Sequence, residues 1–154
     1  MNIINRSLGA FVALLATVAM VPAAFAAYPK SIKVAVEVWN DEVQNLQMTY
    51  ASWKPQGTGL STYHIQPENS GKGFSVTLAN PRSDSATMRY VAAGGKKCEF
   101  TFSHKATFSW IGISPAPEKF ATAKSVGTAS AECGASVTKG TNSMESYTVR
   151  FSMK

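Results

Sequence analysis

Two histidines, His64 and His104, and the acids Glu99 and Glu132 are the residues of this sequence that could support acid–base catalysis. Serine and threonine residues lie near both histidines, so a nucleophile and a base are present in principle. However, the sequence contains no G-x-S-x-G nucleophile turn, no H-E-x-x-H motif and no pair of histidines at metal-ligand spacing. We therefore expect both histidines to be surface or rim residues, and the sequence predicts no catalytic site and no enzyme.

The positions of Glu99 and His104 argue against a shared active site. Glu99 falls on the predicted strand 97–103 and His104 lies at its end, five positions from Glu99. Because successive side chains of a strand point to opposite faces, an odd separation places these two side chains on opposite sides of the sheet. Replacing either histidine with alanine is therefore expected to leave activity within a fewfold of the parent.

Cys98 and Cys133 are the only cysteines. In an oxidising compartment an even pair is predicted to form a disulfide, and this bridge would contribute roughly 3–4 kcal/mol in the chain-entropy model. A metal site is the competing interpretation, but neither cysteine has a second cysteine nearby and His64 is distant in sequence. The sequence therefore predicts no metal and no cofactor.

The aromatic residues provide a candidate binding surface. Trp39 and Trp53 fall on the faces opposite the aliphatic residues of their predicted strands, close to charged and polar neighbours. Exposed tryptophan and tyrosine beside lysine suit contact with lipid headgroups, carbohydrate or protein. The alternative is that both tryptophans complete the core, and the sequence leaves both interpretations open. The candidate surface consists of Trp39, Trp53, Lys54, Tyr63, Lys105 and Trp110.

Most of the chain alternates apolar and polar residues with a period of two, which predicts short strands. The predicted strands are 32–39, 46–53, 61–65, 74–78, 87–91, 97–103, 107–113 and 146–152. The first two are expected to pair as a hairpin, and 87–91 is expected to pair with 97–103 through Gly94-Gly95. The segment 69–73 is predicted to be a turn, while 119–131 shows only weak periodicity. The sequence predicts an all-β fold, an antiparallel sandwich of about seven to nine short strands with one disulfide.

The N-terminus predicts export. Residues 1–26 contain a short start with one positive charge, an apolar run and Ala24-Phe25-Ala26, which is typical of a signal peptide cleaved after Ala26. A membrane-spanning helix is the alternative, but Pro22 interrupts the run and no basic cluster follows. Residues 27–154 are then one secreted or periplasmic domain.

Charge limits the partners of this domain. Without Arg6 of the leader, fourteen basic and nine acidic residues give a formal charge of +5. The cations are scattered from Lys30 to Lys154, so we expect no nucleic-acid partner. A weak preference for anionic surfaces, such as phospholipid headgroups or acidic glycans, stays open.

Part of the chain resembles a known family. The segments Trp39-Asn40, Ala51-Ser52-Trp53, Ile65-Gln66-Pro67, Ser70-Gly71-Lys72-Gly73-Phe74 and Cys98-Glu99-Phe100-Thr101-Phe102 are similar to the strands and turns of aegerolysin-like proteins. The resemblance covers about half of the chain, and about 40 residues follow where such a domain would end. It implies a small secreted β-sandwich that binds membrane lipids, with aromatic residues at the lipid interface.

The sequence therefore predicts a leading function and an alternative. The first is an exported, non-enzymatic binding module that recognises a protein, a glycan or another envelope component. The second is an aegerolysin-like protein that binds a lipid membrane. In the second case Trp39, Trp53, Tyr63 and Trp110 would anchor in the interface, and Lys54 or Lys105 would attract headgroups.

Overall fold

The computed structural model describes residues 29–55, 57, 59–106, 108–109, 112–113 and 117–154. The predicted signal peptide at 1–26 lies outside these residues and stays a prediction. No helix in the described part of the chain is long and apolar enough to span a membrane.

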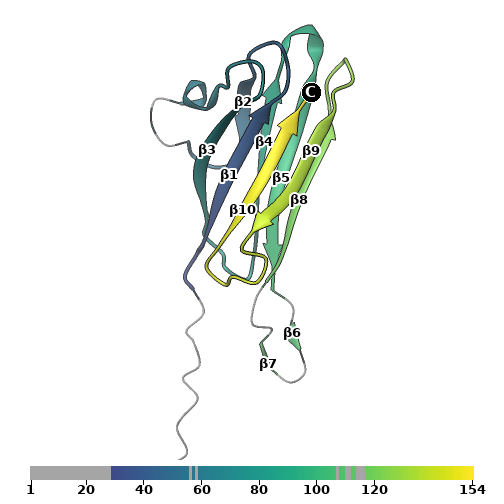
Figure 1. Cartoon of the computed structure of the whole chain (residues 1–154). Coiled ribbons are helices and arrows are strands. Elements are labelled where there is room, and N and C mark those ends of the chain that lie inside the picture. Colours follow the sequence, from purple (N-terminus) through teal and green to yellow (C-terminus); the bar gives the residue numbers. More distant parts are fainter. Residues whose placement is uncertain (1–28, 56, 58, 107, 110–111, 114–116) are drawn as a thin grey trace, which may run out of the picture.

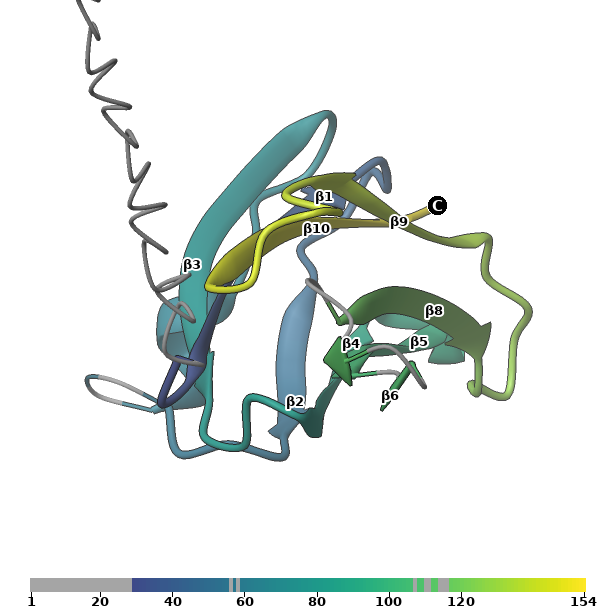
Figure 2. The same cartoon turned by 90° about the horizontal axis from the view of Figure 1, so that it is seen from below.

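Two four-stranded sheets face each other as a sandwich (Figures 1 and 2). All neighbouring strands are antiparallel except β1 and β10, which run parallel. The predicted all-β sandwich is confirmed, and the eight strands of the two sheets lie within the predicted range. The front sheet consists, in spatial order, of β3 (Ser70–Leu78), β1 (Ile32–Asn40), β10 (Ser146–Met153) and β9 (Cys133–Lys139). The back sheet consists of β2 (Gln47–Ala51), β4 (Ser83–Val91), β5 (Lys97–Lys105) and β8 (Glu118–Ser125).

The shorter elements connect or extend these strands. Two 3-10 turns, η1 (Leu60–Tyr63) and η2 (Ala93–Gly95), lie in connections. The strands β6 (Phe108–Ser109) and β7 (Gly112–Ile113) pair only with each other, beyond the end of the back sheet (Figure 1).

The core lies between the sheets because the central strands β1, β5 and β10 bury every second side chain. Phe151 of β10 stacks on Phe100 of β5 across the interface, with ring centroids 4.8 Å apart. Burying a large apolar side chain fully contributes about 1.5–3 kcal/mol, so these alternating residues account for the layered architecture. Fully buried residues include Ile32, Val34, Val36 and Val38 from β1, Phe100 and Phe102 from β5, and Val149, Phe151 and Met153 from β10.

The predicted hairpin between the first two strands is wrong, because β1 and β2 belong to different sheets. The buried side chain of Asn40 organises the crossing segment instead. Its amide nitrogen donates to the carbonyls of Gln44 (2.8 Å) and Gln66 (2.6 Å), and its oxygen accepts from the Glu42 N–H (2.9 Å). These bonds hold the chain as it leaves the front sheet. The predicted hairpin of 87–91 with 97–103 is confirmed as β4 and β5.

The turn predicted at 69–73 is misplaced, because the turn in the structure comes earlier in the chain. The left-handed residues are Glu68 (φ 54°) and Asn69 (φ 53°), and the glycine-rich segment that follows is already strand β3. Segment 61–65 is the turn η1 followed by a single bridge between Ile65 and Leu46, so the strand predicted there is wrong. The weakly periodic segment 119–131 contains all of β8 except its first residue, Glu118.

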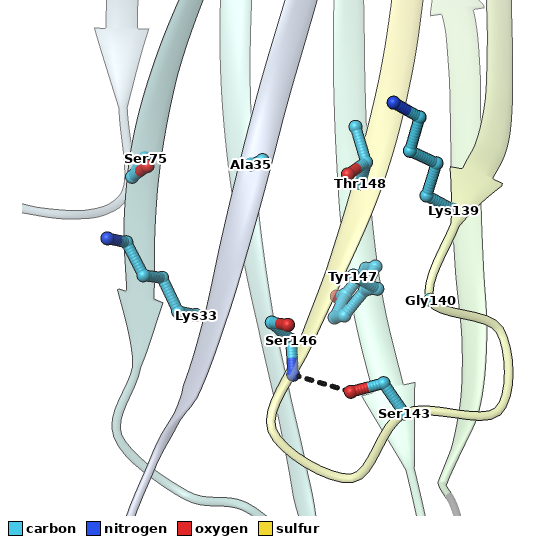
Figure 3. Close-up of a pocket in the computed structure, with 9 residues that line it drawn as sticks. All are labelled: Lys33, Ala35, Ser75, Lys139, Gly140, Ser143, Ser146, Tyr147 and Thr148. Atoms are coloured by element: carbon cyan, nitrogen blue, oxygen red, sulfur yellow. Dashed lines mark hydrogen bonds between the residues drawn. The ribbon is translucent and has the colours of Figure 1, made fainter.

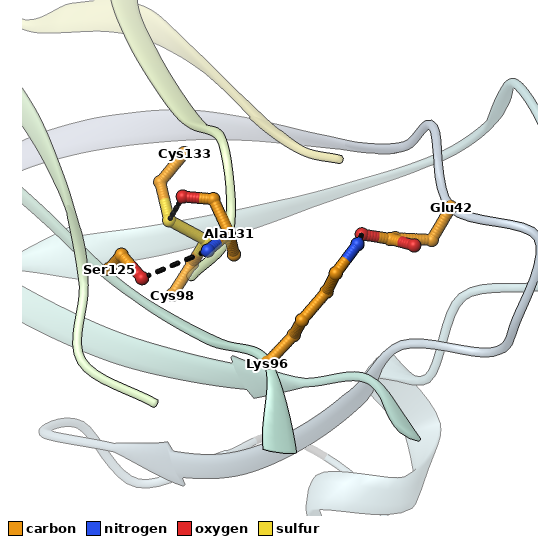
Figure 4. Close-up of a disulfide and its surroundings, with 6 residues drawn as sticks. All are labelled: Glu42, Lys96, Cys98, Ser125, Ala131 and Cys133. Carbon is orange, nitrogen blue, oxygen red and sulfur yellow. Dashed lines mark hydrogen bonds and ion pairs between the residues drawn. A yellow bond between two sulfur atoms is a disulfide. The ribbon is translucent and has the colours of Figure 1, made fainter. Parts of the chain in front are cut away.

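The predicted disulfide is confirmed and joins the two sheets (Figure 4). Cys98 lies on β5 of the back sheet and Cys133 begins β9 of the front sheet, with Cα atoms 5.8 Å apart. Near it, Lys96 forms an ion pair with Glu42 at 2.7 Å. A disulfide is typical of an oxidising compartment.

Candidate binding surface on the front sheet

The outer face of the front sheet is made mostly of small side chains. The outward positions of β3, beside β1, are Gly71, Gly73, Ser75 and Thr77, and those of β10 are Ser146, Thr148, Arg150 and Ser152. Between these two rows β1 places Lys33, Ala35, Glu37 and Trp39. The face is therefore polar, with one large aromatic side chain near one end.

Trp39 lies on this face with 37% of its surface exposed. Its neighbours in the register are Gly71 on β3 and Ser152 on β10. A Cβ atom added to Gly71 would lie 3.2 Å from two ring atoms of Trp39, so the indole occupies the space of the missing side chain. Glycine in a strand commonly marks such a close approach.

Arg150 and Glu37 form an ion pair beside the indole. The Nε and Nη2 atoms of Arg150 donate to one carboxylate oxygen of Glu37 at 3.0 and 2.9 Å. The Arg150 guanidinium carbon lies 5.6 Å from the Trp39 ring centroid, within cation–π range. Since the pair is exposed, it adds little stability, but it holds the guanidinium beside the ring.

A shallow depression of about 400 Å³ surrounds this group. It combines an aromatic surface with charged hydrogen-bonding groups and with the bare backbone of two glycines. The residues that line it are Glu37, Trp39, Asn69, Gly71, Lys72, Gly73 and Arg150.

A second depression, of about 340 Å³, lies on the same face toward the start of β1 (Figure 3). Two lysines and several hydroxyl groups line it, with no acidic residue among the lining side chains. The residues are Lys33, Ala35, Ser75, Lys139, Gly140, Ser143, Ser146, Tyr147 and Thr148.

The turn between β9 and β10 forms one wall of this second depression. Gly140 adopts a left-handed conformation (φ 72°), and a Cβ atom there would lie 2.6 Å from the Ser146 carbonyl oxygen. Lys119 of β8 donates to the carbonyls of Thr141 and Ser143, each at 2.7 Å. Partial burial lowers the pKa of Lys119. The turn is therefore tied to the back sheet.

Two residues of the sequence-predicted surface lie inside the sandwich. Tyr63 is only 6% exposed, and its ring meets Phe74 edge-on with centroids 4.7 Å apart, so its assignment to the surface is wrong. Trp53 is half-buried against Phe74 (6.1 Å) and Phe102 (6.0 Å). Trp53 follows the end of β2, where strand alternation no longer applies, and apolar contacts draw its ring inward.

The remaining predicted surface residues do not gather around Trp39. Lys54 and Lys105 are exposed, and Lys105 ends β5 in the back sheet, opposite Ser83 and Glu118. Trp110 lies outside the described residues. Of the predicted surface residues that the structure describes, Trp39 alone lies on the front face, and its neighbours there were not among the predicted residues.

The histidines are not part of this surface. His64 is exposed, but His104 is 1% exposed, so the prediction that both are surface or rim residues is wrong for His104. His104 points inward among apolar side chains, and its Nε2 lies 2.8 Å from the Asn80 carbonyl oxygen. Glu99 points outward and pairs with Arg89 at 2.6 Å, so the prediction of opposite faces is confirmed. Among the described residues no group of three or more His, Cys, Asp or Glu could hold a metal ion.

Sequence reasoning missed Gly71, Arg150 and Lys139 as site residues. Glu37 and Arg150 are 113 positions apart, and only the parallel pairing of β1 with β10 brings them together. The available signal was the polar half of each alternating strand, which marks outward positions but does not identify the neighbouring strand.

Comparison with known proteins leaves the site to be interpreted from its geometry. No protein-family model matches the chain, and no curated protein matches it.

Proposed function

We propose that this protein is an exported, non-enzymatic binding module that recognises a glycan with the outer face of its front sheet. The supporting observation is the exposed Trp39 ring, seated against Gly71 and next to the Arg150–Glu37 pair. The predicted signal peptide and the Cys98–Cys133 disulfide support export.

The chemistry of this group suits a sugar ring. An indole face offers a broad apolar contact for the C–H groups of a pyranose, and the neighbouring guanidinium and carboxylate can donate to and accept from its hydroxyl groups. Both depressions on this face are shallow, which suits a ligand that extends across the surface. An enclosed pocket is the usual site for a small molecule.

A protein partner is less well supported on this face. Protein interfaces concentrate apolar and aromatic residues in a buried centre. The outer face of the front sheet instead surrounds one tryptophan with glycine, serine and threonine.

Lipid binding of the aegerolysin-like kind is the alternative proposal, and it rests on the sequence resemblance. Of its four expected aromatic anchors, Trp39 is exposed, Trp53 is half-buried, Tyr63 is buried and Trp110 lies outside the described residues. The described residues therefore provide one exposed anchor for lipid binding. They support the glycan-binding proposal better.

The test compares Trp39→Ala with Tyr50→Ala in the exported protein, using polysaccharide affinity electrophoresis and calorimetry. Tyr50 is a matched control on the back sheet, because it is 41% exposed and has Arg89 5.0 Å from its ring centroid. We expect Trp39→Ala to weaken glycan binding about tenfold or more and Tyr50→Ala to change it by less than about twofold. Weaker glycan binding by Tyr50→Ala alone would indicate that the site lies on the back sheet. Binding to no polysaccharide would reject the proposal.

A further inference from the structure

We infer that the front face takes a linear acidic glycan, with a sugar ring on Trp39 and anionic groups at Lys33 and Lys139. The inference rests on the proposed function and adds the charge, the orientation and the minimum length of the ligand. Three observations support it: cations without partners, a hydroxyl group fixed as a donor, and the separation of the two depressions.

The charges that line the two depressions are unbalanced. Their cations at outward positions are Lys33, Lys139 and Arg150, whereas Lys72 is on the inward parity of β3, and their one acid, Glu37, is bonded to Arg150. Within the described part of the chain, neither Lys33 nor Lys139 forms an ion pair. Since a patch of unpaired cations attracts anions, the face is complementary to carboxylate or sulfate groups.

Ser143, in the turn between β9 and β10, adds a hydrogen-bond donor at the edge of the lysine depression (Figure 3). Its hydroxyl oxygen accepts from the backbone N–H groups of Glu145 (3.2 Å) and Ser146 (3.1 Å). A serine hydroxyl has two acceptor sites and one donor, so these two bonds leave the O–H available to donate. An ammonium group and an oriented O–H are the donors that a carboxylate or sulfate requires.

The two depressions lie along one strand. Lys33 and Trp39 are six residues apart on β1, which corresponds to about 20 Å at the rise of an extended strand. Between them, on the outer face, lie Ala35 and Glu37, and Ala35 is flanked in the register by Ser75 and Thr148. A linear chain can therefore lie flat along β1 and reach both ends, whereas a small anion would occupy the lysine end alone.

The experiment measures calorimetric affinity of the exported protein for heparin, polygalacturonate and dextran, and its sedimentation with phosphatidylglycerol–phosphatidylcholine vesicles. We expect both acidic polymers to bind about tenfold or more tightly than neutral dextran, and their affinity to fall with salt. Tighter binding of heparin would indicate that sulfate contributes to recognition, whereas tighter binding of polygalacturonate, which carries carboxylates alone, would indicate carboxylate recognition. Heparin fragments shorter than about 20 Å are expected to bind more weakly than longer ones, because they cannot reach both depressions.

The variants separate the lysine site from general positive charge. The double variant Lys33→Ala/Lys139→Ala is compared with Lys54→Ala/Lys105→Ala, which removes the same charge from exposed lysines elsewhere. We expect the first to lower heparin affinity about tenfold and the second to lower it less than about threefold.

The outcomes distinguish this inference from the proposed function. Equal losses in the two double variants would overturn the inference, because the charge effect would then be non-specific. Equal affinity for dextran and heparin, with dependence on Trp39, would overturn it but support the proposed function. Binding to no polysaccharide would overturn both, and sedimentation with anionic vesicles alone would favour the lipid alternative.

Discussion

The indole of Trp39 fills the space that a side chain on Gly71 would occupy, across the β1–β3 pair. The glycine therefore determines how an exposed aromatic ring is presented on the front sheet. The sequence predicts a turn at 69–73, but in the structure Gly71 belongs to strand β3 and leaves room for the ring.

Gly71→Val is expected to displace the indole and to weaken glycan binding about as much as Trp39→Ala. Because Trp39 is partly exposed, its ring can move outward, and the melting temperature should change little. Thr77→Val is the control, since Thr77 is an exposed outward residue of the same strand that lines neither depression. Calorimetric affinity and tryptophan emission measure both effects. Equal affinity in the two variants would contradict the role of Gly71.

Removal of the Cys98–Cys133 bridge is expected to lower stability by about 2–4 kcal/mol. The bridge links β5 to β9 and therefore restrains one sheet against the other. The variant Cys98→Ala/Cys133→Ala avoids placing a hydroxyl group at Cys98, which is fully buried. Urea denaturation of the variant and of the oxidised parent gives the difference, and identical midpoints would refute the prediction.

Removing the Tyr147 hydroxyl and removing the Tyr90 hydroxyl should have different effects on stability. The Tyr147 hydroxyl is buried and has no hydrogen-bond partner among the described residues, whereas that of Tyr90 donates to the Tyr63 carbonyl at 2.9 Å. Tyr147→Phe is therefore expected to leave stability unchanged or to raise it. Tyr90→Phe should cost about 1 kcal/mol or more, because it leaves a buried carbonyl without its donor. Thermal denaturation of both variants at neutral pH is the measurement.

Stability is expected to fall above about pH 10, the ordinary pKa of tyrosine. Burial raises the pKa of both Tyr90 and Tyr147 in the folded protein. Above the ordinary value the unfolded chain ionises while the folded state keeps its protons, so stability present below pH 10 is lost as pH rises. Tyr147→Phe removes one of these groups and should flatten the decline. Urea midpoints between pH 8 and pH 11 would test this, and an unchanged slope would contradict it.

Alanine substitutions of the two histidines should differ in their effect on stability and should leave glycan binding nearly unchanged. His64→Ala is expected to change neither property, because the side chain is exposed. His104→Ala removes a buried ring and its contact with the Asn80 carbonyl, which should cost about 1–3 kcal/mol. We expect both variants to bind glycan within a fewfold of the parent. A loss of biological activity by several orders of magnitude in a variant that still folds would instead indicate catalysis.

The local features of the fold were predictable from the sequence, because they depend on neighbouring residues. The alternation at Ile32, Val34, Val36 and Val38 determined a strand with one buried face, and the β4–β5 hairpin followed from two alternating runs joined by Gly94-Gly95. The disulfide followed from the presence of only two cysteines. The opposite orientations of Glu99 and His104 followed from the period of a strand.

Sheet partners and the candidate site were decided only by the tertiary structure, because they depend on contacts between distant segments. Strand alternation places Trp39 on the face opposite the aliphatic residues of its strand, but it does not show that this face is exposed or that Gly71 and Arg150 lie beside the ring. The same alternation did not apply to Trp53, which follows the end of β2 and packs against Phe74 and Phe102. Periodicity specifies which side of a strand a residue occupies. Packing of the whole chain specifies its neighbours.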